Sequence, residues 1–305
     1  MRRTSAVLAA ASLAAAVGIT GAATPALAAT HATTTHTTTT HATTTASYYL
    51  SLGDSLAQGV QPNAAGTDVE TSQGYADQLY TALKATNPAL KLDKLGCPGE
   101  TTTSMINGGL CTYPDTSQLA QAVAFLKAHL GHVQLVTIDI GANDLNPCIA
   151  LTVPSQIVTC LEKVIPVAVQ NLTTIMTQLR AAAGATTKII GMSYYDPEAA
   201  DWLQGTSAGR QLAALSRALL STYNGDLGKV YTAAGATVAD VYTAFHTGGS
   251  KPYVTLPAFG SVPRYVAYVC SYTWACAAPP VGPNEHANRL GYAVIANTFL
   301  NADLG

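Results

Sequence analysis

Short runs of apolar and β-branched residues alternate along the chain with longer stretches in which apolar residues recur every three or four positions. A strand buried on both faces has the form of such a short run, bounded by turn residues. The first run stops at the turn-forming pair Gly53-Asp54. The predicted strands are 48–52, 91–95, 134–140, 188–192 and 237–241.

The longer stretches have the periodicity of helices with one apolar face. One helix is expected across 119–130, a longer one across 157–179, and the last across 287–300. Pro166 lies inside the second and should kink it, because proline lacks the backbone N–H.

Strand and helix alternate about five times, and parallel neighbours in a sheet need crossover connections of this kind. We therefore expect one α/β domain over 47–305, a three-layer α/β/α sandwich with a parallel sheet of about five strands. In such sheets ligands bind at the carboxyl ends of the strands.

The first 28 residues have the features of a secretory signal peptide. Arg2 and Arg3 precede an apolar run, and the segment ends at the small-residue sequence ALA, 26–28. The run is too short to cross a bilayer, and Pro25 interrupts the residues after it. The mature protein is thus expected to be secreted and extracellular, with no stable membrane insertion.

Residues 29–46 are nearly all threonine, alanine and histidine, a composition that cannot bury itself in a core. We interpret this segment as a disordered linker that could carry O-linked sugars. Its evenly spaced His31, His36 and His41 offer a metal little preorganisation, so no metal site is expected.

Composition limits the possible partners. Removal of Arg2 and Arg3 with the signal leaves 13 of the 15 basic residues against 17 acidic ones, a net charge near −4. Nucleic acid is therefore not an expected partner. Only 10% of the chain is charged and 48% is hydrophobic, which is enough apolar material for one large core. We expect a monomer.

Six cysteines in an exported chain indicate disulfides, for which fifteen pairings are possible. Metal binding is the competing interpretation, but no CxxC pair or nearby histidine completes a tetrahedral set. Neighbours in sequence predict three local bridges: Cys97 with Cys111, Cys148 with Cys160, and Cys270 with Cys276.

Three candidate functional residues come directly after predicted strands. Ser55 lies in GDSL, 53–56, at the end of the first strand. Gly99 lies in GCPGETT, 96–102, where its N–H could approach a ligand, and Asn143 lies in IGAND, 140–144. A fourth candidate, His286, precedes ANRLGY at the start of the last helix. Ser55, Gly99 or Asn143 alone is more often a turn residue, but the ordered set of four indicates a site.

This ordered set of Ser55, Gly99, Asn143 and His286 resembles the GDSL or SGNH hydrolase family from about Ser47 onward. Within the family, the chain most resembles the secreted actinobacterial lipases and esterases. The linker, the paired cysteines and the HANxxGY ending are also typical of these enzymes. The resemblance implies a flavodoxin-like sheet and ester hydrolysis without a cofactor.

Ester hydrolysis by a serine needs a nucleophile, a base and donors for the oxyanion. His286 is suited to take the proton of the Ser55 hydroxyl, since an unperturbed histidine has a pKa of about 6.5. The backbone N–H groups of Ser55 and Gly99 and the amide of Asn143 would hold the oxyanion, each worth roughly 3 kcal/mol.

Other residues compete for these roles. GTSAG, 205–209, fits the nucleophile elbow of another hydrolase class, but that motif needs a buried strand before it. We interpret Ser207 as a helix cap instead. His246 is the main rival to His286, whereas His129 and His132 end a predicted helix and look structural.

The family commonly has an aspartate three residues before the histidine, where this chain has Pro283. We predict that a backbone carbonyl between Val281 and Asn284 orients the ring, with Asp240 as the distant alternative. Glu285 has the wrong spacing for this role.

The substrate class is left open by the sequence. We expect acyl lipid esters, with an acetyl ester of carbohydrate as the enzymatic alternative and a noncatalytic surface-binding module as the alternative of another class. Five aromatic residues between 255 and 283 either line an acyl groove or pack a loop onto the domain: Phe259, Tyr265, Tyr268, Tyr272 and Trp274.

Overall fold

The structure is a computed structural model that describes residues 46–304. The predicted signal peptide and all but the last residue of the predicted linker lie outside the described residues. Within 46–304, none of the helices combines the length and the apolar character needed to cross a bilayer.

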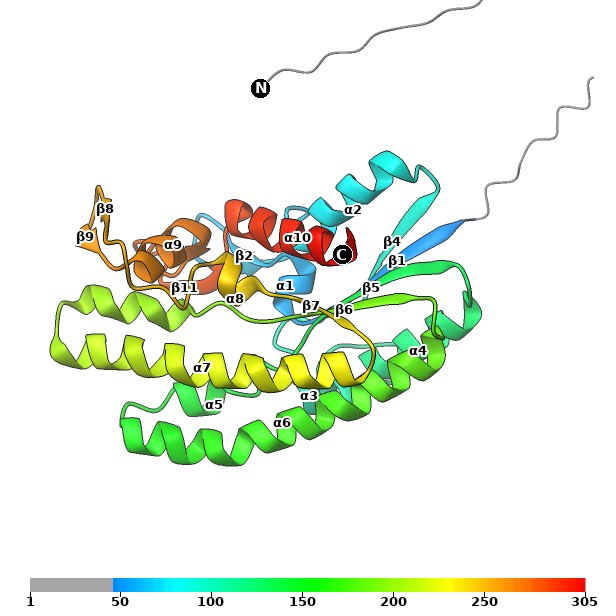
Figure 1. The fold of residues 1–305 in the computed structure, drawn as a ribbon, viewed down its shortest axis with the longest axis horizontal. Helices are drawn as coiled ribbons and strands as arrows, with labels where there is room; N and C mark the ends of the chain where they lie inside the picture. Colours follow the sequence, from blue (N-terminus) through cyan, green and yellow to red (C-terminus); the bar gives the residue numbers. More distant parts are fainter. Residues whose placement is uncertain (1–45, 305) are drawn as a thin grey trace, which may run out of the picture. The chain divides into compact units, whose positions relative to one another are not determined.

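A five-stranded sheet forms the centre of the domain (Figure 1). All four strand pairs are parallel, and the order is β4-β1-β5-β6-β7, so β1 lies between β4 and β5. The chain switches direction across the sheet at β1, which is the position where ligands bind in doubly wound sheets. The strands are β1 (Ser47–Gly53), β4 (Leu90–Lys94), β5 (Val133–Asp139), β6 (Lys188–Met192) and β7 (Thr237–Ala239).

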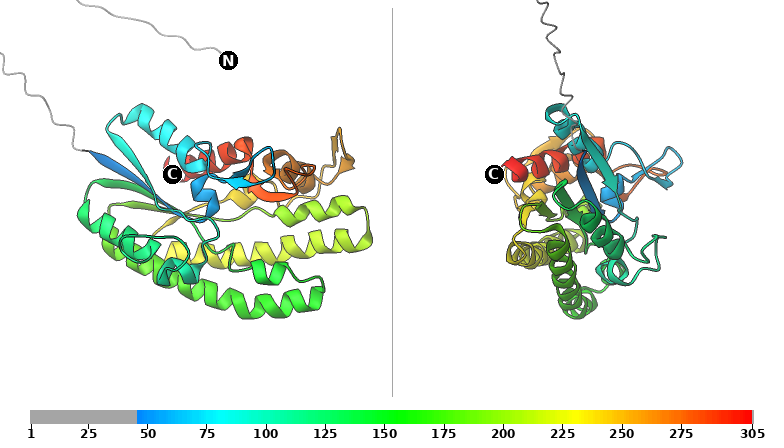
Figure 2. Two further views of the ribbon diagram at one scale, coloured as in Figure 1. Left: turned by 180° about the vertical axis from the view of Figure 1, so that it is seen from behind. Right: turned by 90° about the vertical axis from the view of Figure 1, so that its right-hand side faces the viewer.

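Helices cover both faces of this sheet, as Figures 1 and 2 show. On one face α2 (Tyr75–Thr86) packs on α10 (Arg289–Leu304). On the other, α6 (Pro154–Ala183) packs on α3 (Thr102–Asn107), α4 (Gln118–Ala128) and α7 (Ser207–Ala233). The predicted three-layer α/β/α fold is confirmed.

Short elements connect these layers or extend beyond the sheet. Near the N-terminal half are α1 (Ser55–Gln58), β2 (Gln61–Pro62), β3 (Asp68–Val69) and α5 (Asn146–Ile149). The C-terminal half adds η1 (Pro197–Gln204), α8 (Val241–Ala244), β8 (Val254–Leu256), β9 (Gly260–Val262), α9 (Arg264–Tyr272), β10 (Thr273–Trp274) and β11 (Asn284–Ala287).

Two element boundaries differ from the prediction. The fifth strand ends at Ala239, because the Asp240 side chain accepts the Thr243 N–H and so begins α8. The last helix begins at Arg289 instead of Ala287, which belongs to β11. Helix α6 continues through Pro166 as one element of 30 residues, and the kink expected there stays a prediction.

The core is continuous through the three layers, and fully buried apolar side chains of β1 and β5 form its centre. The three predicted disulfides are present: Cys97–Cys111, Cys148–Cys160 and Cys270–Cys276. The second joins α5 to α6, and the third joins α9 to the segment after β10.

Candidate active site

One cavity of about 460 Å³ lies at the carboxyl end of the sheet, and its size is typical of small-molecule sites. Its lining includes Ser55, Asn143 and His286, three of the residues singled out in the sequence. They come from α1, the loop after β5, and β11, so the fold brings together residues 231 positions apart in the chain.

Ser55 is placed by the end of β1. Gly53 has φ +137°, and a Cβ there would lie 2.2 Å from the Asp139 carbonyl oxygen, so only glycine fits between β1 and β5. The Asp54 side chain then accepts the Leu56 N–H and caps the short helix α1. As the first residue of a helix, Ser55 has a backbone N–H without an intrahelical acceptor.

A pair of buried carboxyl groups lies beneath Ser55. The Asp54 N–H donates to Asp139 Oδ2 at 3.3 Å, and the Tyr75 hydroxyl donates to Asp139 Oδ1. Burial raises the pKa of both carboxyl groups, and the charge of Asp54 raises the pKa of Asp139 well above its usual range. Burial and the charge of Asp54 therefore both favour the protonated form of Asp139.

Asn143 is held on both sides of its amide. Its Nδ2 donates to the Glu100 carbonyl at 3.0 Å, and its Oδ1 accepts from Asn146 Nδ2 at 2.9 Å. Because one partner only accepts and the other donates, the orientation of the amide is fixed, and one Nδ2 hydrogen stays free. The next residue, Asp144, accepts both the Thr102 N–H (2.8 Å) and the Thr102 hydroxyl (2.6 Å).

Gly99 is the predicted site residue that does not line the cavity. It is exposed, with φ +82°, and a Cβ there would meet nothing closer than Leu110 Cδ2 at 3.7 Å. Its loop reaches the site through the next residue, Glu100, whose carbonyl holds Asn143. A role for the Gly99 N–H in an oxyanion hole stays a prediction.

His286 is buried, with 6% of its surface exposed, on the two-stranded ribbon β10–β11. The HANxxGY ending holds this ribbon to the domain. The Asn288 side chain caps α10 and donates to the Ser271 carbonyl at 2.8 Å. Gly291 lies so close to the Tyr272 carbonyl that a Cβ would be 1.9 Å from it, and the Tyr292 hydroxyl donates to the Val60 carbonyl at 2.8 Å.

The predicted backbone carbonyl partner of His286 is wrong. His286 Nδ1 lies 2.9 Å from Oδ1 of Asn284, a side-chain carbonyl two residues earlier. The same Oδ1 accepts the His286 backbone N–H at 3.0 Å, a geometry the strand makes possible. Asp240 contacts Ser193 and Thr243 instead of the histidine.

The two neighbouring tyrosines after β6 connect the two sides of the cavity. The Tyr194 hydroxyl donates to Asp54 Oδ2 at 3.3 Å, and the Tyr195 hydroxyl donates to the Glu285 carbonyl at 2.8 Å. Next to them, burial raises the pKa of Asp196 to about 7, although its side chain accepts the Ser216 hydroxyl at 2.8 Å.

The rival residues lie elsewhere. Ser207 is exposed and comes after the 3₁₀ helix η1, so the strand that a nucleophile elbow requires is missing before it. The cap of α7 is Thr206, one residue earlier than predicted. His246 contacts Arg264 Nη2 at 2.8 Å, and burial together with that charge lowers the pKa of His246. His129 ends α4 with Nδ1 2.9 Å from the Phe125 carbonyl, which agrees with a structural role.

The aromatic residues between 255 and 283 do not line this cavity. Tyr265 belongs to a second apolar cluster, Tyr272 packs against the main core, and Trp274 pairs with Asn284 in the ribbon that carries His286. The groove interpretation is thus wrong for this cavity. Its apolar wall comes from α5, α6 and α7: Ile149, Ile157, Leu161, Ile165, Leu212, Leu215, Leu219 and Leu220.

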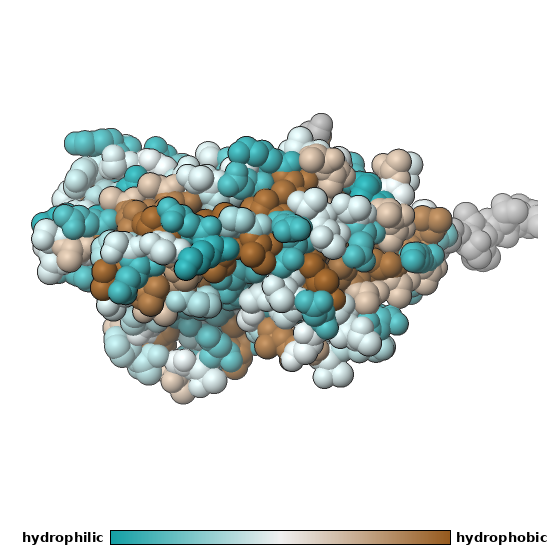
Figure 3. Space-filling model, turned by 90° about the horizontal axis from the view of Figure 1, so that it is seen from below, coloured by the Kyte–Doolittle hydropathy of each residue, from teal (hydrophilic) through white to brown (hydrophobic). Residues whose placement is uncertain are grey.

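The face of the domain on the side of α6 shows apolar residues among polar ones (Figure 3). Near the cavity, Ile149 is 40% exposed and Leu151 is 36% exposed, and both also line it. The apolar wall therefore continues to the surface.

Solved structures with a similar fold include hydrolases. An extracellular lipase from Streptomyces rimosus superposes with a TM-score of 0.57 at 16% identity, over 84% of this chain and all of the lipase. A phospholipase A1 from Streptomyces albidoflavus superposes with a TM-score of 0.53 at 16% identity, over 85% of this chain and all of the phospholipase. An acetylxylan esterase from Geobacillus stearothermophilus superposes with a TM-score of 0.51 at 15% identity, over 85% of this chain and 95% of the esterase. At these identities the likeness shows the fold, which is that of the SGNH hydrolases.

The family is established by the sequence. The model of the GDSL-like lipase/acylhydrolase family matches residues 51–294, and the chain belongs to this family. No curated protein matches the chain significantly.

Proposed function

We propose that this protein is a secreted serine esterase that hydrolyses acyl esters through an acyl-enzyme at Ser55. The observation that carries the proposal is the shared cavity, in which a hydroxyl, an imidazole and a free amide N–H meet an apolar wall. Three disulfides support export, because such bonds persist in oxidising compartments.

In this mechanism His286 Nε2 takes the hydroxyl proton as Ser55 Oγ bonds to the carbonyl carbon of the ester. The Ser55 N–H and the free Asn143 N–H hold the oxyanion, together with the Gly99 N–H predicted from the sequence. The protonated His286 then gives its proton to the leaving alcohol. Water, activated by the same nitrogen, hydrolyses the acyl-enzyme.

The apolar wall supports a medium or long acyl chain as the substrate group. Ile157 and Ile165 lie eight residues apart on α6, and a helix rises 1.5 Å per residue, so this wall is about 12 Å long. An acetyl group would leave most of it empty. The acidic residues at the same cavity, Glu198, Asp201 and Glu285, favour the carbohydrate acetyl esterase as second candidate, since carboxylates accept hydrogen bonds from sugar hydroxyls.

A series of p-nitrophenyl esters from acetate to palmitate tests the proposal. We expect kcat/KM to rise from acetate toward octanoate or longer. Ile165→Trp should lower the rate on long esters more than on acetate. Val167→Trp, on the same helix but 52% exposed, is the matched control and should change neither. A maximum at acetate would favour the carbohydrate esterase.

Labelling by a fluorophosphonate separates an enzyme from a binding module, because only an activated serine reacts readily. The wild-type protein and Ser207→Ala should be labelled, whereas Ser55→Ala should not. Failure of the wild-type protein to react would contradict the catalytic proposal.

A further inference from the structure

The amide of Asn284 has only one possible orientation. Its Oδ1 faces the backbone N–H of His286, which can only donate, and its Nδ2 faces the Asp68 carboxylate, which can only accept. Oδ1 must therefore also accept from the ring, so His286 Nδ1 carries the hydrogen. The other ring nitrogen, Nε2, is then unprotonated in the neutral ring and free to act as a base.

Asp68 completes a chain of three side chains. Its Oδ1 accepts from Asn284 Nδ2 at 2.9 Å and lies 3.7 Å from His286 Nδ1. The Asp68 side chain is 45% exposed and the His286 side chain is 7% exposed, so the carboxylate stays hydrated beside a buried ring. A hydrated carboxylate keeps its charge without the free-energy cost of burial.

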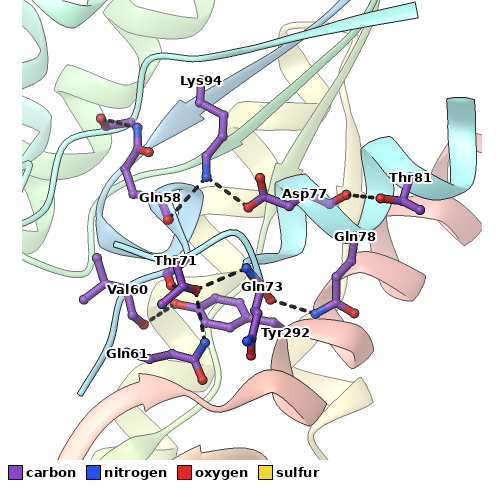
Figure 4. Close-up of polar contacts among 12 residues, drawn as sticks. Gln58, Val60, Gln61, Thr71, Gln73, Asp77, Gln78, Thr81, Lys94 and Tyr292 are labelled. Atoms are coloured by element: carbon purple, nitrogen blue, oxygen red, sulfur yellow. Dashed lines mark hydrogen bonds and ion pairs between the residues drawn. The ribbon is translucent and has the colours of Figure 1, made fainter. Parts of the chain in front are cut away.

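The hairpin that carries Asp68 is fixed at both ends. At its base the Thr71 hydroxyl donates to the Gly59 carbonyl at 2.6 Å, and Gln61 Nε2 donates to that hydroxyl oxygen at 3.2 Å (Figure 4). At its tip Gly66 lies so close to Pro280 that a Cβ would be 1.9 Å from the Pro280 carbonyl oxygen. These contacts hold β3 against the segment that leads into β11.

We infer that Asp68 and Asn284 are positioning residues that together replace the aspartate of a Ser-His-Asp triad, Asn284 fixing the ring and Asp68 fixing Asn284 and stabilising the imidazolium. This inference rests on the proposed function of His286. Pro283 occupies the position three residues before His286 at which the family commonly has an aspartate. The carboxylate of Asp68 instead reaches the ring from a hairpin more than 200 residues away in sequence.

Two other acids lie near the ring. Asp54 is buried beneath Ser55, and Glu285 lies exposed on the same strand as His286, with neither hydrogen-bonded to the imidazole. Among the acids of residues 46–304, Asp68 is the one whose charge is within 4 Å of a ring nitrogen. Its removal should therefore disfavour the imidazolium more than removal of Glu285 does.

Single variants test the two roles. Asn284→Ala should lower kcat by about 30- to 100-fold and Asp68→Asn by about tenfold, both with KM nearly unchanged, since the triad aspartate itself is worth up to about 10⁴. Asp68→Asn should also move the acidic limb of the kcat/KM profile down by about 0.5 to 1 pH unit. The matched control is Glu70→Gln, an exposed acid two residues further along, which should change neither.

An exchange of the two side-chain types is the sharper test. Asn284→Asp alone puts two carboxylates side by side and should lower kcat or stability. In Asp68→Asn/Asn284→Asp, Asn at 68 donates to Asp at 284, which accepts from the ring, so kcat should return to within about threefold of wild type. The low-field Nδ1 proton in NMR spectra should persist in the double variant and disappear in Asn284→Ala.

The outcomes separate the two proposals. If Ser55→Ala or His286→Ala stays active, the proposed function is wrong. If both are inactive but Asp68→Asn and Asn284→Ala behave like Glu70→Gln, with unchanged melting temperatures, the positioning roles are overturned. Equal losses in Glu70→Gln and Asp68→Asn would likewise overturn them, because the effect would be one of overall charge.

Discussion

Ser55 lies at the end of a central strand of the sheet, whereas His286 lies on a two-stranded ribbon outside it. The nucleophile side is made of buried strand ends, where Gly53 and Gly141 allow a contact too close for any side chain. The histidine side depends on contacts between distant segments: Asn288 with α9, Tyr292 with Val60, and Asn284 with Asp68. The nucleophile side is set by close backbone packing at the strand ends, and the histidine side by side-chain hydrogen bonds between segments outside the sheet.

The largest effects should come from breaking both sides of the site. Ser55→Ala and His286→Ala should each lower kcat by at least about 10³, and the double variant should lose little more, because the two residues act as a unit. Steady-state kinetics on one ester measures all three. Additive losses would mean that the two sides do not act in one step.

A smaller effect is expected on the nucleophile side from the oxyanion donor. Asn143→Ala should lower kcat by about 10² to 10³ with little change in KM, since the amide acts on charge that develops in the transition state. Asn146→Ala, which removes only the partner that orients Asn143, should cost clearly less. A rise in KM at constant kcat would instead assign Asn143 to substrate binding.

Removal of one disulfide on each side of the site tests how much each bond stabilises its side. Cys97–Cys111 closes a loop of 14 residues on the nucleophile side, and Cys270–Cys276 closes one of 6 beside the ribbon. In the chain-entropy model their removal as paired alanine variants costs roughly 3 and 2 kcal/mol. Urea unfolding measures the stability, and activity should fall earlier in urea for the second pair because it supports the histidine ribbon.

The smallest effect concerns Asp196, next to the tyrosines that join the two sides. Its pKa of about 7 exceeds the unfolded value of about 3.9, so the native state binds the extra proton between these pH values. Stability should therefore fall as pH rises from about 4 to 7 and then level off. Asp196→Asn should be more stable by roughly 1 to 3 kcal/mol at pH 8 and nearly unchanged at pH 4, as judged by urea unfolding.

A control for this effect is Asp201→Asn, a less buried acid at the same cavity. The gain in stability of this variant should depend much less on pH. Equal pH dependence in the two variants would mean that burial of Asp196 does not control the change of stability with pH.

The sequence predicted most of the sheet because buried parallel strands leave a strong local pattern. Its boundary errors occur where one capping side chain begins a helix, as Asp240 and Thr206 do. From the sequence Asn284 was considered only for its backbone carbonyl, and the contact of its Oδ1 with His286 Nδ1 was missed because side-chain directions depend on the local backbone conformation. Asp68 had no local signal at all.

By itself the sequence determined the fold class and the disulfide pairs and singled out Ser55, Asn143 and His286, because each of these depends on patterns or motifs a few residues long. Only the tertiary structure decided what surrounds them. The apolar wall comes from α5, α6 and α7 instead of the aromatic segment, and the histidine is oriented by Asn284 and Asp68. The physical reason is that side-chain contacts between distant segments depend on packing, to which no local pattern corresponds.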